Sequence, residues 1–294
     1  MTPNTELSLC ARLRFVTRKR RRGGTWGERR STRRGAGLEF ADYRDYTPGD
    51  DPRRVDWNLY ARLDRPYVRL FEEEEDLAVS VVLDGSASMA WGEDADARWP
   101  AAQRLAGALG AMALLGGDGL RGALLRGDAR GAWGPQRGRG YVPPWLRWIE
   151  TLRPEEAAPA RPPAATLREL AAHPQRPGLL LLLTDGYDPP GLASGIAALA
   201  GRGHEVVLLH LLTADDVAPT ARGDLRLVDV ETGAKCEVTV DNATLDAYQR
   251  RFAAWQSELR ALVGKHQGRY VALRTDQPLR QMLLENLRRA HVVQ

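Results

Sequence analysis

Two apolar runs, each followed directly by polar and acidic residues, restrict most strongly what this chain can fold into. Residues 77–83 (Leu-Ala-Val-Ser-Val-Val-Leu) and 179–183 (five leucines) carry no charge. Runs of this kind predict strands buried on both faces, as in a parallel sheet covered by helices. Asp84 follows the first run, and Thr184 and Asp185 follow the second. Open α/β sheets place their sites outside the carboxyl ends of strands, so these polar residues are the first candidates for a site.

The segment after the first run supplies oxygen donors at alternating positions. Asp84, Ser86 and Ser88 are spaced i, i+2, i+4, and no His or Cys lies among them. Hard oxygen donors suit Mg²⁺ rather than zinc. Ser and Gly after a strand also serve simply to begin the next helix, so the pattern by itself leaves both readings open.

Composition is that of an ordinary globular protein. The chain has 294 residues, 43% of them hydrophobic and 27% charged, with a net charge of +4. Cys10 and Cys236 are the two cysteines and form no CxxC pair, which excludes a disulfide framework and a thiolate zinc site. The uncharged stretch 105–117 falls short of the roughly 20 residues of a spanning helix. We therefore expect a soluble, cytoplasmic protein without a membrane span.

The chain divides into two parts of different character. Residues 12–34 contain 11 Lys or Arg in 23 positions, and a strand-like segment follows at 67–71. We assign residues 1–76 to a basic N-terminal arm with a small β-containing module. From residue 77, strands and helices alternate, which predicts an α/β domain over 77–294 with a mostly parallel sheet and helices on both faces.

The other predicted elements follow from periodicity and turn signals. An inserted hairpin and long helix are expected at about 214–268, the hairpin strands at 225–230 and 236–240. Further helices are predicted at 101–115, 142–152, 192–201, 243–266 and 277–291, strands at 205–212 and 269–273, and a strand pair within 119–133.

Two sets of motifs carry a resemblance to known families. The Asp-x-Ser-x-Ser pattern at 84–88 resembles the metal-ion-dependent adhesion site (MIDAS) of von Willebrand factor A domains. Tyr-Thr-Pro-Gly-Asp-Asp at 46–51, Asp-Trp at 56–57 and Asp-Val-Glu-Thr-Gly at 229–233 are more specific. They resemble the domain-of-unknown-function family 58, a bacterial group with a von Willebrand A-type core, and the match spans roughly residues 37 to 290.

This resemblance implies a von Willebrand A-like (Rossmann-like) fold and a metal site made of Asp84, Ser86, Ser88, Thr166 and Asp185. The two serine hydroxyls would bind the metal directly, Thr166 directly or through water, and the two carboxylates through waters and hydroxyl hydrogen bonds. The cofactor is expected to be Mg²⁺, or another divalent cation such as Mn²⁺ or Ca²⁺. A helix N-cap for Thr166 and a turn aspartate for Asp185 are the alternatives.

The resemblance also implies a function. Family members commonly occur beside MoxR-type AAA ATPases and are thought to act with them in maturing or remodelling other proteins. We therefore expect a Mg²⁺-dependent protein-binding, chaperone-like adaptor, with a MoxR-type AAA ATPase and an acidic client residue as its partners. Trp91 and Trp99 lie close after the metal loop, where lining the partner surface and packing in the core are equal alternatives.

Two other functions are weighed against this one. The arginine-rich N-terminus suggests binding to nucleic acid or to an acidic surface. Phe15 and Trp26 are the only aromatic residues in it, however, so it lacks the interleaved aromatics that would stack on bases. A metal-dependent phosphotransferase would also place Asp after a buried strand, but it would carry a second acid where this chain has Ser86. The five histidines form no recognisable catalytic arrangement, so we expect no enzymatic activity.

Overall fold

The chain forms two compact units in the computed structural model, which describes residues 3–18, 30–31, 38–74, 77–92, 97–125, 131–155, 163–173 and 176–294. The large unit comprises residues 1–18 and 77–294, and the small unit residues 19–76. Residues 3–18 thus belong to the large unit rather than to the N-terminal arm that the basic composition predicts.

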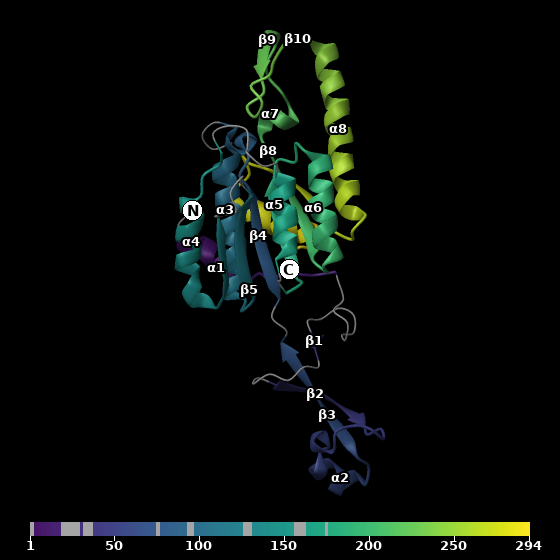
Figure 1. Ribbon diagram of the computed structural model, residues 1–294. Helices are drawn as coiled ribbons and strands as arrows, with labels where there is room; N and C mark the ends of the chain where they lie inside the picture. Colours follow the sequence, from purple (N-terminus) through teal and green to yellow (C-terminus); the bar gives the residue numbers. More distant parts are fainter. Residues whose placement is uncertain are drawn as a thin grey trace. The chain divides into compact units, whose positions relative to one another are not determined.

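A six-stranded sheet forms the middle layer of the large unit (Figure 1), in the order β11-β8-β7-β4-β5-β6. All neighbouring pairs are parallel except β5 and β6, which are antiparallel. The mostly parallel sheet predicted from the sequence is thus confirmed. The strands are β4 (Ala78–Asp84), β5 (Gly119–Leu125), β6 (Ala132–Arg137), β7 (Leu179–Thr184), β8 (Glu205–Leu212) and β11 (Arg269–Arg274).

Helices cover both faces of this sheet, which explains why the apolar runs 77–83 and 179–183 carry no charge. In β4, Val81 and Leu83 pack into one core and Val82 into the other. The first core lies under α3 (Arg98–Leu115) and α4 (Val142–Thr151). The second lies under α5 (Pro163–Ala172), α6 (Pro189–Gly201) and α8 (Asn242–Gly264). Among the helices that the structure describes, none has the length and apolar character to cross a membrane.

The two ends of the chain pair with each other on the large unit. Phe15 and Val293 form an antiparallel bridge, and the N–H of Val16 donates to the carbonyl of Val292 at 2.9 Å. Leu13 and Phe15 are buried, and α1 (Pro3–Cys10) precedes them. These apolar residues alternate with arginines, and their burial is the reason that this segment joins the large unit. The predicted helix 277–291 is a short α9 (Leu279–Gln281) followed by a π-helical segment, Met282–Leu287.

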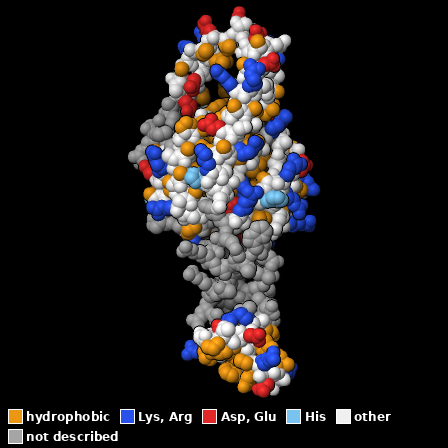
Figure 2. All heavy atoms as spheres, turned by 90° about the vertical axis from the view of Figure 1, so that its right-hand side faces the viewer, with side chains coloured by type: hydrophobic (Ala, Val, Ile, Leu, Met, Phe, Trp, Pro, Cys, Tyr) orange, Lys and Arg blue, Asp and Glu red, His pale blue; other side chains and the backbone are white. Residues whose placement is uncertain are grey.

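The small unit is built on an antiparallel sheet, β1 (Arg30–Ser31), β3 (Tyr67–Glu74) and β2 (Leu38–Asp45). Asp56 caps helix α2 (Trp57–Leu63) by accepting hydrogen bonds from the N–H groups of Asn58 and Leu59. This gives the Asp-Trp motif a structural role. Figure 2 shows hydrophobic side chains gathered on the face of this unit that is in view. Most of the basic segment, residues 19–29 and 32–34, lies outside the described residues, so nucleic-acid binding through it stays a prediction.

The insertion expected at about 214–268 stands beyond the carboxyl edge of the sheet (Figure 1). It begins with the short α7 (Ala214–Val217) after β8. An antiparallel hairpin follows, β9 (Gly223–Val228) with β10 (Lys235–Val240), and leads into α8. The lower half of α8 packs against the sheet through buried residues such as Leu259 and Val263. The insertion therefore borders the edge of the sheet that carries the expected site.

The close approach of α3 and α4 gives a test of the packing. Trp145 donates its indole N–H to the carbonyl of Gly107 at 3.1 Å, and a Cβ atom on Gly110 would overlap the ring of Trp145. We expect Gly110→Ala to lower the free energy of unfolding by about 1–3 kcal/mol through overpacking, measured by urea denaturation. The control is Gly201→Ala at the end of α6, where an added Cβ meets no atom within 4 Å. Equal stability of the two variants would contradict this packing.

Candidate metal centre

The loop after β4 brings three of the predicted residues together. The carboxylate of Asp84 accepts a hydrogen bond from the N–H of Ser86 at 3.0 Å and one from the hydroxyl of Thr184 at 2.6 Å. A single 3₁₀ turn, Ala87–Ala90, follows and places the Ser88 hydroxyl 3.1 Å from that of Ser86. Since all these side chains are buried, the alternating spacing produces a compact group of oxygen atoms.

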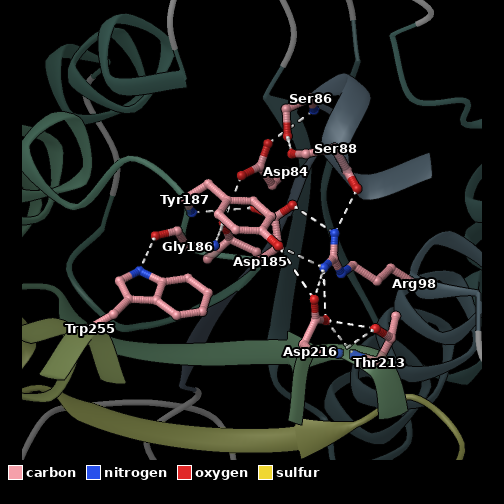
Figure 3. A network of polar contacts seen from close by, with 11 residues as sticks. Asp84, Ser86, Ser88, Arg98, Asp185, Gly186, Tyr187, Thr213, Asp216 and Trp255 are labelled. Atoms are coloured by element: carbon pink, nitrogen blue, oxygen red, sulfur yellow. Dashed lines mark hydrogen bonds and ion pairs between the residues drawn. The ribbon is translucent and has the colours of Figure 1, made fainter. Parts of the chain in front are cut away.

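Asp185 joins this group from the neighbouring strand. β7 pairs with β4 in parallel, with Leu183 opposite Leu83, so the residues after the two strands lie side by side. Asp84 and Asp185 are only 4% and 2% exposed. Figure 3 shows their side chains at this edge with Ser86 and Ser88. Four of the five predicted residues therefore meet at the carboxyl ends of β4 and β7.

Thr166, the fifth predicted residue, is buried in the first turn of α5. The helix begins at Pro163, three residues earlier, so Thr166 is not its N-cap. Its participation in the metal site stays a prediction.

Burial and neighbouring negative charges disfavour the ionised form of both carboxylates. Burial raises the pKa of Asp84 above its ordinary range, although hydrogen bonds from Thr184 and Ser86 oppose this, and the charge of Glu155 raises it further. Burial and the charge of Asp84 raise the pKa of Asp185 to about 7, against the lowering effects of Arg98 and of the Ser88 hydroxyl. Two like charges out of water disfavour each other's ionised form, and a bound cation would relieve this.

A buried arginine completes the polar cluster, and sequence reasoning missed it. Arg98, the first residue of α3, is 1% exposed. One guanidinium nitrogen donates to the Ser88 carbonyl at 2.9 Å and lies 3.4 Å from the Asp185 carboxylate. The other contacts both carboxylate oxygens of Asp216 at 2.7 Å. Arg98 lies in an otherwise ordinary helical segment, so only the long-range fold reveals its role.

Aromatic side chains border the cluster. Tyr187 is 54% exposed, and its ring stacks on Trp255 with a centroid distance of 5.3 Å. The Trp255 indole donates to the carbonyl of Gly186 at 3.0 Å (Figure 3). Trp91, directly after the 3₁₀ turn, is 56% exposed, whereas Trp99 is buried. Trp91 is thus free to contact a partner, and for Trp99 the core alternative holds.

The donor set fits a hard divalent cation, because it offers hydroxyl and carboxylate oxygens at one buried point. Among the described residues, no group of three or more His, Cys, Asp or Glu side chains is arranged to hold a metal ion. The proposed set differs from such a group, since three of its five members contribute hydroxyls. Direct contacts through hydroxyls would leave most of the cation's charge uncompensated and available to a partner.

Comparison with known proteins places the chain among relatives of similar length. The model of the family described as "Protein of unknown function DUF58" matches residues 42–258. Uncharacterized proteins of Mycobacterium tuberculosis (strain ATCC 25618 / H37Rv) and Mycobacterium bovis are each 30% identical over 243 residues, which cover 82% of this chain and 76% of theirs.

Two solved structures are similar at low identity. A conserved hypothetical protein BatB from Bacteroides thetaiotaomicron has a TM-score of 0.42 and 17% identity, covering 67% of this chain and 90% of its own. An aerotolerance-related membrane protein from Bacteroides fragilis has a TM-score of 0.46 and 16% identity, covering 71% and 98%.

The raised pKa of Asp185 gives a pH-dependent test of the site. The unfolded chain loses this proton near pH 3.8, but the folded, metal-free chain retains it up to about pH 7. Stability should therefore fall as the pH rises between these values. Asp185→Asn cannot ionise and escapes that loss. The quantity to compare is the melting temperature of the variant minus that of the wild type, both measured in EDTA. We expect this difference to be larger at pH 8 than at pH 5 by about 3 °C or more. A difference that is the same at both pH values would contradict the burial of two mutually repelling carboxylates.

Proposed function

The chain belongs to the family of proteins of unknown function DUF58, and from this premise we propose that it is a Mg²⁺-dependent protein-binding module. In this proposal the hydroxyls of Ser86 and Ser88 bind the cation directly and Thr166 binds it directly or through water. Asp84 and Asp185 act through waters and hydroxyl hydrogen bonds. Mn²⁺ or Ca²⁺ would serve in place of Mg²⁺. The module would act as an adaptor, and its location would be the cytoplasm.

One observation carries the proposal: two hydroxyls 3.1 Å apart lie beside two buried carboxylates at the carboxyl edge of the sheet. The buried charges there are unequal, because Arg98 contacts Asp185 and Asp216, and Asp84 is buried beside Asp185 as a further carboxylate. Burying like charges without compensation is costly. A divalent cation would offset this excess, and it is the ligand that the site supports best.

The metal would supply an electropositive contact for an acidic group. When bound through hydroxyls, the cation keeps an open position that an Asp or Glu of a partner can fill. Tyr187 and Trp91 border the same loops and are more than half exposed, and large aromatic side chains of this kind provide contact area at protein interfaces. Recognition would combine a metal-bridged carboxylate with aromatic packing around it.

The partner we propose is a MoxR-type AAA ATPase, acting with this module in protein maturation or remodelling. The family resemblance suggests this partner, and the acidic group that completes the metal site would come from it or from a client protein. An adaptor of this kind needs exposed side chains that contact the partner and a fixed group that binds it. The exposed aromatic side chains of Tyr187 and Trp91 and the buried oxygen donors are consistent with these two needs.

Binding rather than catalysis is favoured by the surroundings of the serines. The hydroxyls of Ser86 and Ser88 face each other instead of a histidine that could activate one of them as a nucleophile. His210 is buried, with its Nδ1 2.6 Å from the Tyr270 hydroxyl. Burial lowers the pKa of His210 to about 4, so this ring is a weak base. We therefore propose no enzymatic role for the site.

Metal binding by purified protein tests the proposal first. We expect isothermal titration with Mg²⁺ to give one site, weakened at least about tenfold in Asp84→Asn. Asp118→Asn is the matched control, because Asp118 is also buried but accepts the N–H of Leu77 at the opposite edge of the sheet. Its Mg²⁺ affinity should equal that of the wild type. Titrations without binding, or equal loss in both variants, would contradict the proposed site.

Partner binding is tested with the purified MoxR-type ATPase of the same organism. We expect immobilised wild-type protein to retain this ATPase in Mg²⁺ and to release it in EDTA, because the metal would bridge the two proteins. Asp84→Asn should retain little of it in either buffer, whereas Asp118→Asn should behave as wild type. Retention that persists in EDTA would overturn the metal-bridged contact.

A further inference from the structure

The guanidinium of Arg98 joins the loops that follow three neighbouring strands. It contacts the Ser88 carbonyl after β4, Asp185 and the Tyr187 hydroxyl after β7, and Asp216 after β8. Figure 3 shows it between Ser88 and Asp216. A buried guanidinium beside Asp185 would compete with a bound metal for the charge of that carboxylate.

The contacts of Arg98 with its two carboxylates are unequal. Both oxygens of Asp216 lie 2.7 Å from one nitrogen of Arg98, which is the length of a strong charge-assisted hydrogen bond. The nearest oxygen of Asp185 is 3.4 Å from the other nitrogen, outside the usual range for such bonds. The guanidinium is therefore paired mainly with Asp216 and interacts only weakly with Asp185.

Asp216 is itself held firmly from two sides. Its carboxylate accepts hydrogen bonds from the N–H and hydroxyl of Thr213 at 2.7 and 2.8 Å. The first of these and the hydrogen bond from the N–H of Asp216 to the Thr213 hydroxyl form the capping box of α7. Its carbonyl accepts the Tyr248 hydroxyl of α8 at 2.7 Å. The carboxylate therefore has a defined position from which it draws Arg98 away from Asp185.

We propose that Asp216 is a positioning residue that maintains the metal affinity of the site by holding the Arg98 guanidinium away from Asp185. This inference rests on the proposed metal-binding function. Without Asp216, the guanidinium would pair with Asp185, and a divalent cation would have to displace it. With Asp216 in place, the carboxylate of Asp185 is not paired with the guanidinium and stays available to the metal and its waters.

Three variants separate this role from a merely structural one. Asp216→Asn keeps an oxygen that can accept from Thr213, but its amide group cannot neutralise Arg98. We expect it to bind Mg²⁺ about tenfold more weakly than wild type, as substitutions next to metal ligands do. Arg98→Gln in the same chain removes the competing cation, so the double variant should return to within about threefold of wild type. Asp216→Glu keeps the charge and should lose much less than Asp216→Asn.

A control variant and two separate measurements distinguish a change in Mg²⁺ affinity from a change in stability. Asp215→Asn removes the same charge one residue away at an exposed position, and its Mg²⁺ affinity should not change. Affinities come from isothermal titration of the full chain with Mg²⁺, and melting temperatures in EDTA report stability separately. Affinity that recovers in the double variant, whatever its melting temperature, supports the proposal, because a structural defect would grow with the second substitution.

Two results would overturn the proposal in distinguishable ways. Wild-type affinity in Asp216→Asn, or a double variant that binds as weakly as Asp216→Asn or more weakly, would exclude the positioning role while leaving the metal site intact. A wild-type chain that binds no Mg²⁺ would remove the proposed function as well. If the double variant does not fold, the two single variants decide. An equal loss of Mg²⁺ affinity in Asp216→Glu and Asp216→Asn would count against the role of the charge. Mg²⁺ affinity that is retained in Asp216→Glu but lost in Asp216→Asn would support it.

Discussion

The parallel pairing of β4 with β7 is the constraint on which the rest of the molecule depends. This pairing places Leu83 opposite Leu183, so that the next residues of both strands, Asp84 and Asp185 among them, leave the sheet side by side. Helices on both faces exclude water from the strands, and the carboxylates at their ends are buried with them. The same packing that stabilises the sheet therefore creates a local excess of negative charge that needs compensation.

Compensation of that charge links the site to the rest of the large unit. Arg98 supplies one positive charge from the start of α3, and this charge pairs mainly with the carboxylate of Asp216. The charge left on Asp84 and Asp185 suits a divalent cation, and the serine hydroxyls between them are suitable ligands. Because Asp216 also contacts Thr213 and α8, the electrostatic balance of the site extends to the insertion that stands beside it.

Local patterns predicted the central strands and four clustered site residues, because an uncharged run and its polar end are neighbours in sequence. Arg98 escaped prediction, since its acidic partners are 87 and 118 residues away and nothing nearby marks it as buried. The N-terminal segment was misplaced for a similar reason. Its basic composition suggested an arm, but Phe15 pairs with Val293 near the other end of the chain. Neither periodicity nor composition predicts such contacts between segments that are far apart in the sequence.

The central claim is that one hard divalent ion binds to the hydroxyls of Ser86 and Ser88, beside Thr166 and the carboxylates of Asp84 and Asp185. The most direct measurement is a crystal structure grown with Mn²⁺, which can replace Mg²⁺ at oxygen sites, with anomalous data collected near the manganese absorption edge. We expect an anomalous peak between the two serine hydroxyls at the carboxyl edge of β4. A well-ordered loop without such a peak, with Arg98 paired closely to Asp185 in its place, would contradict it.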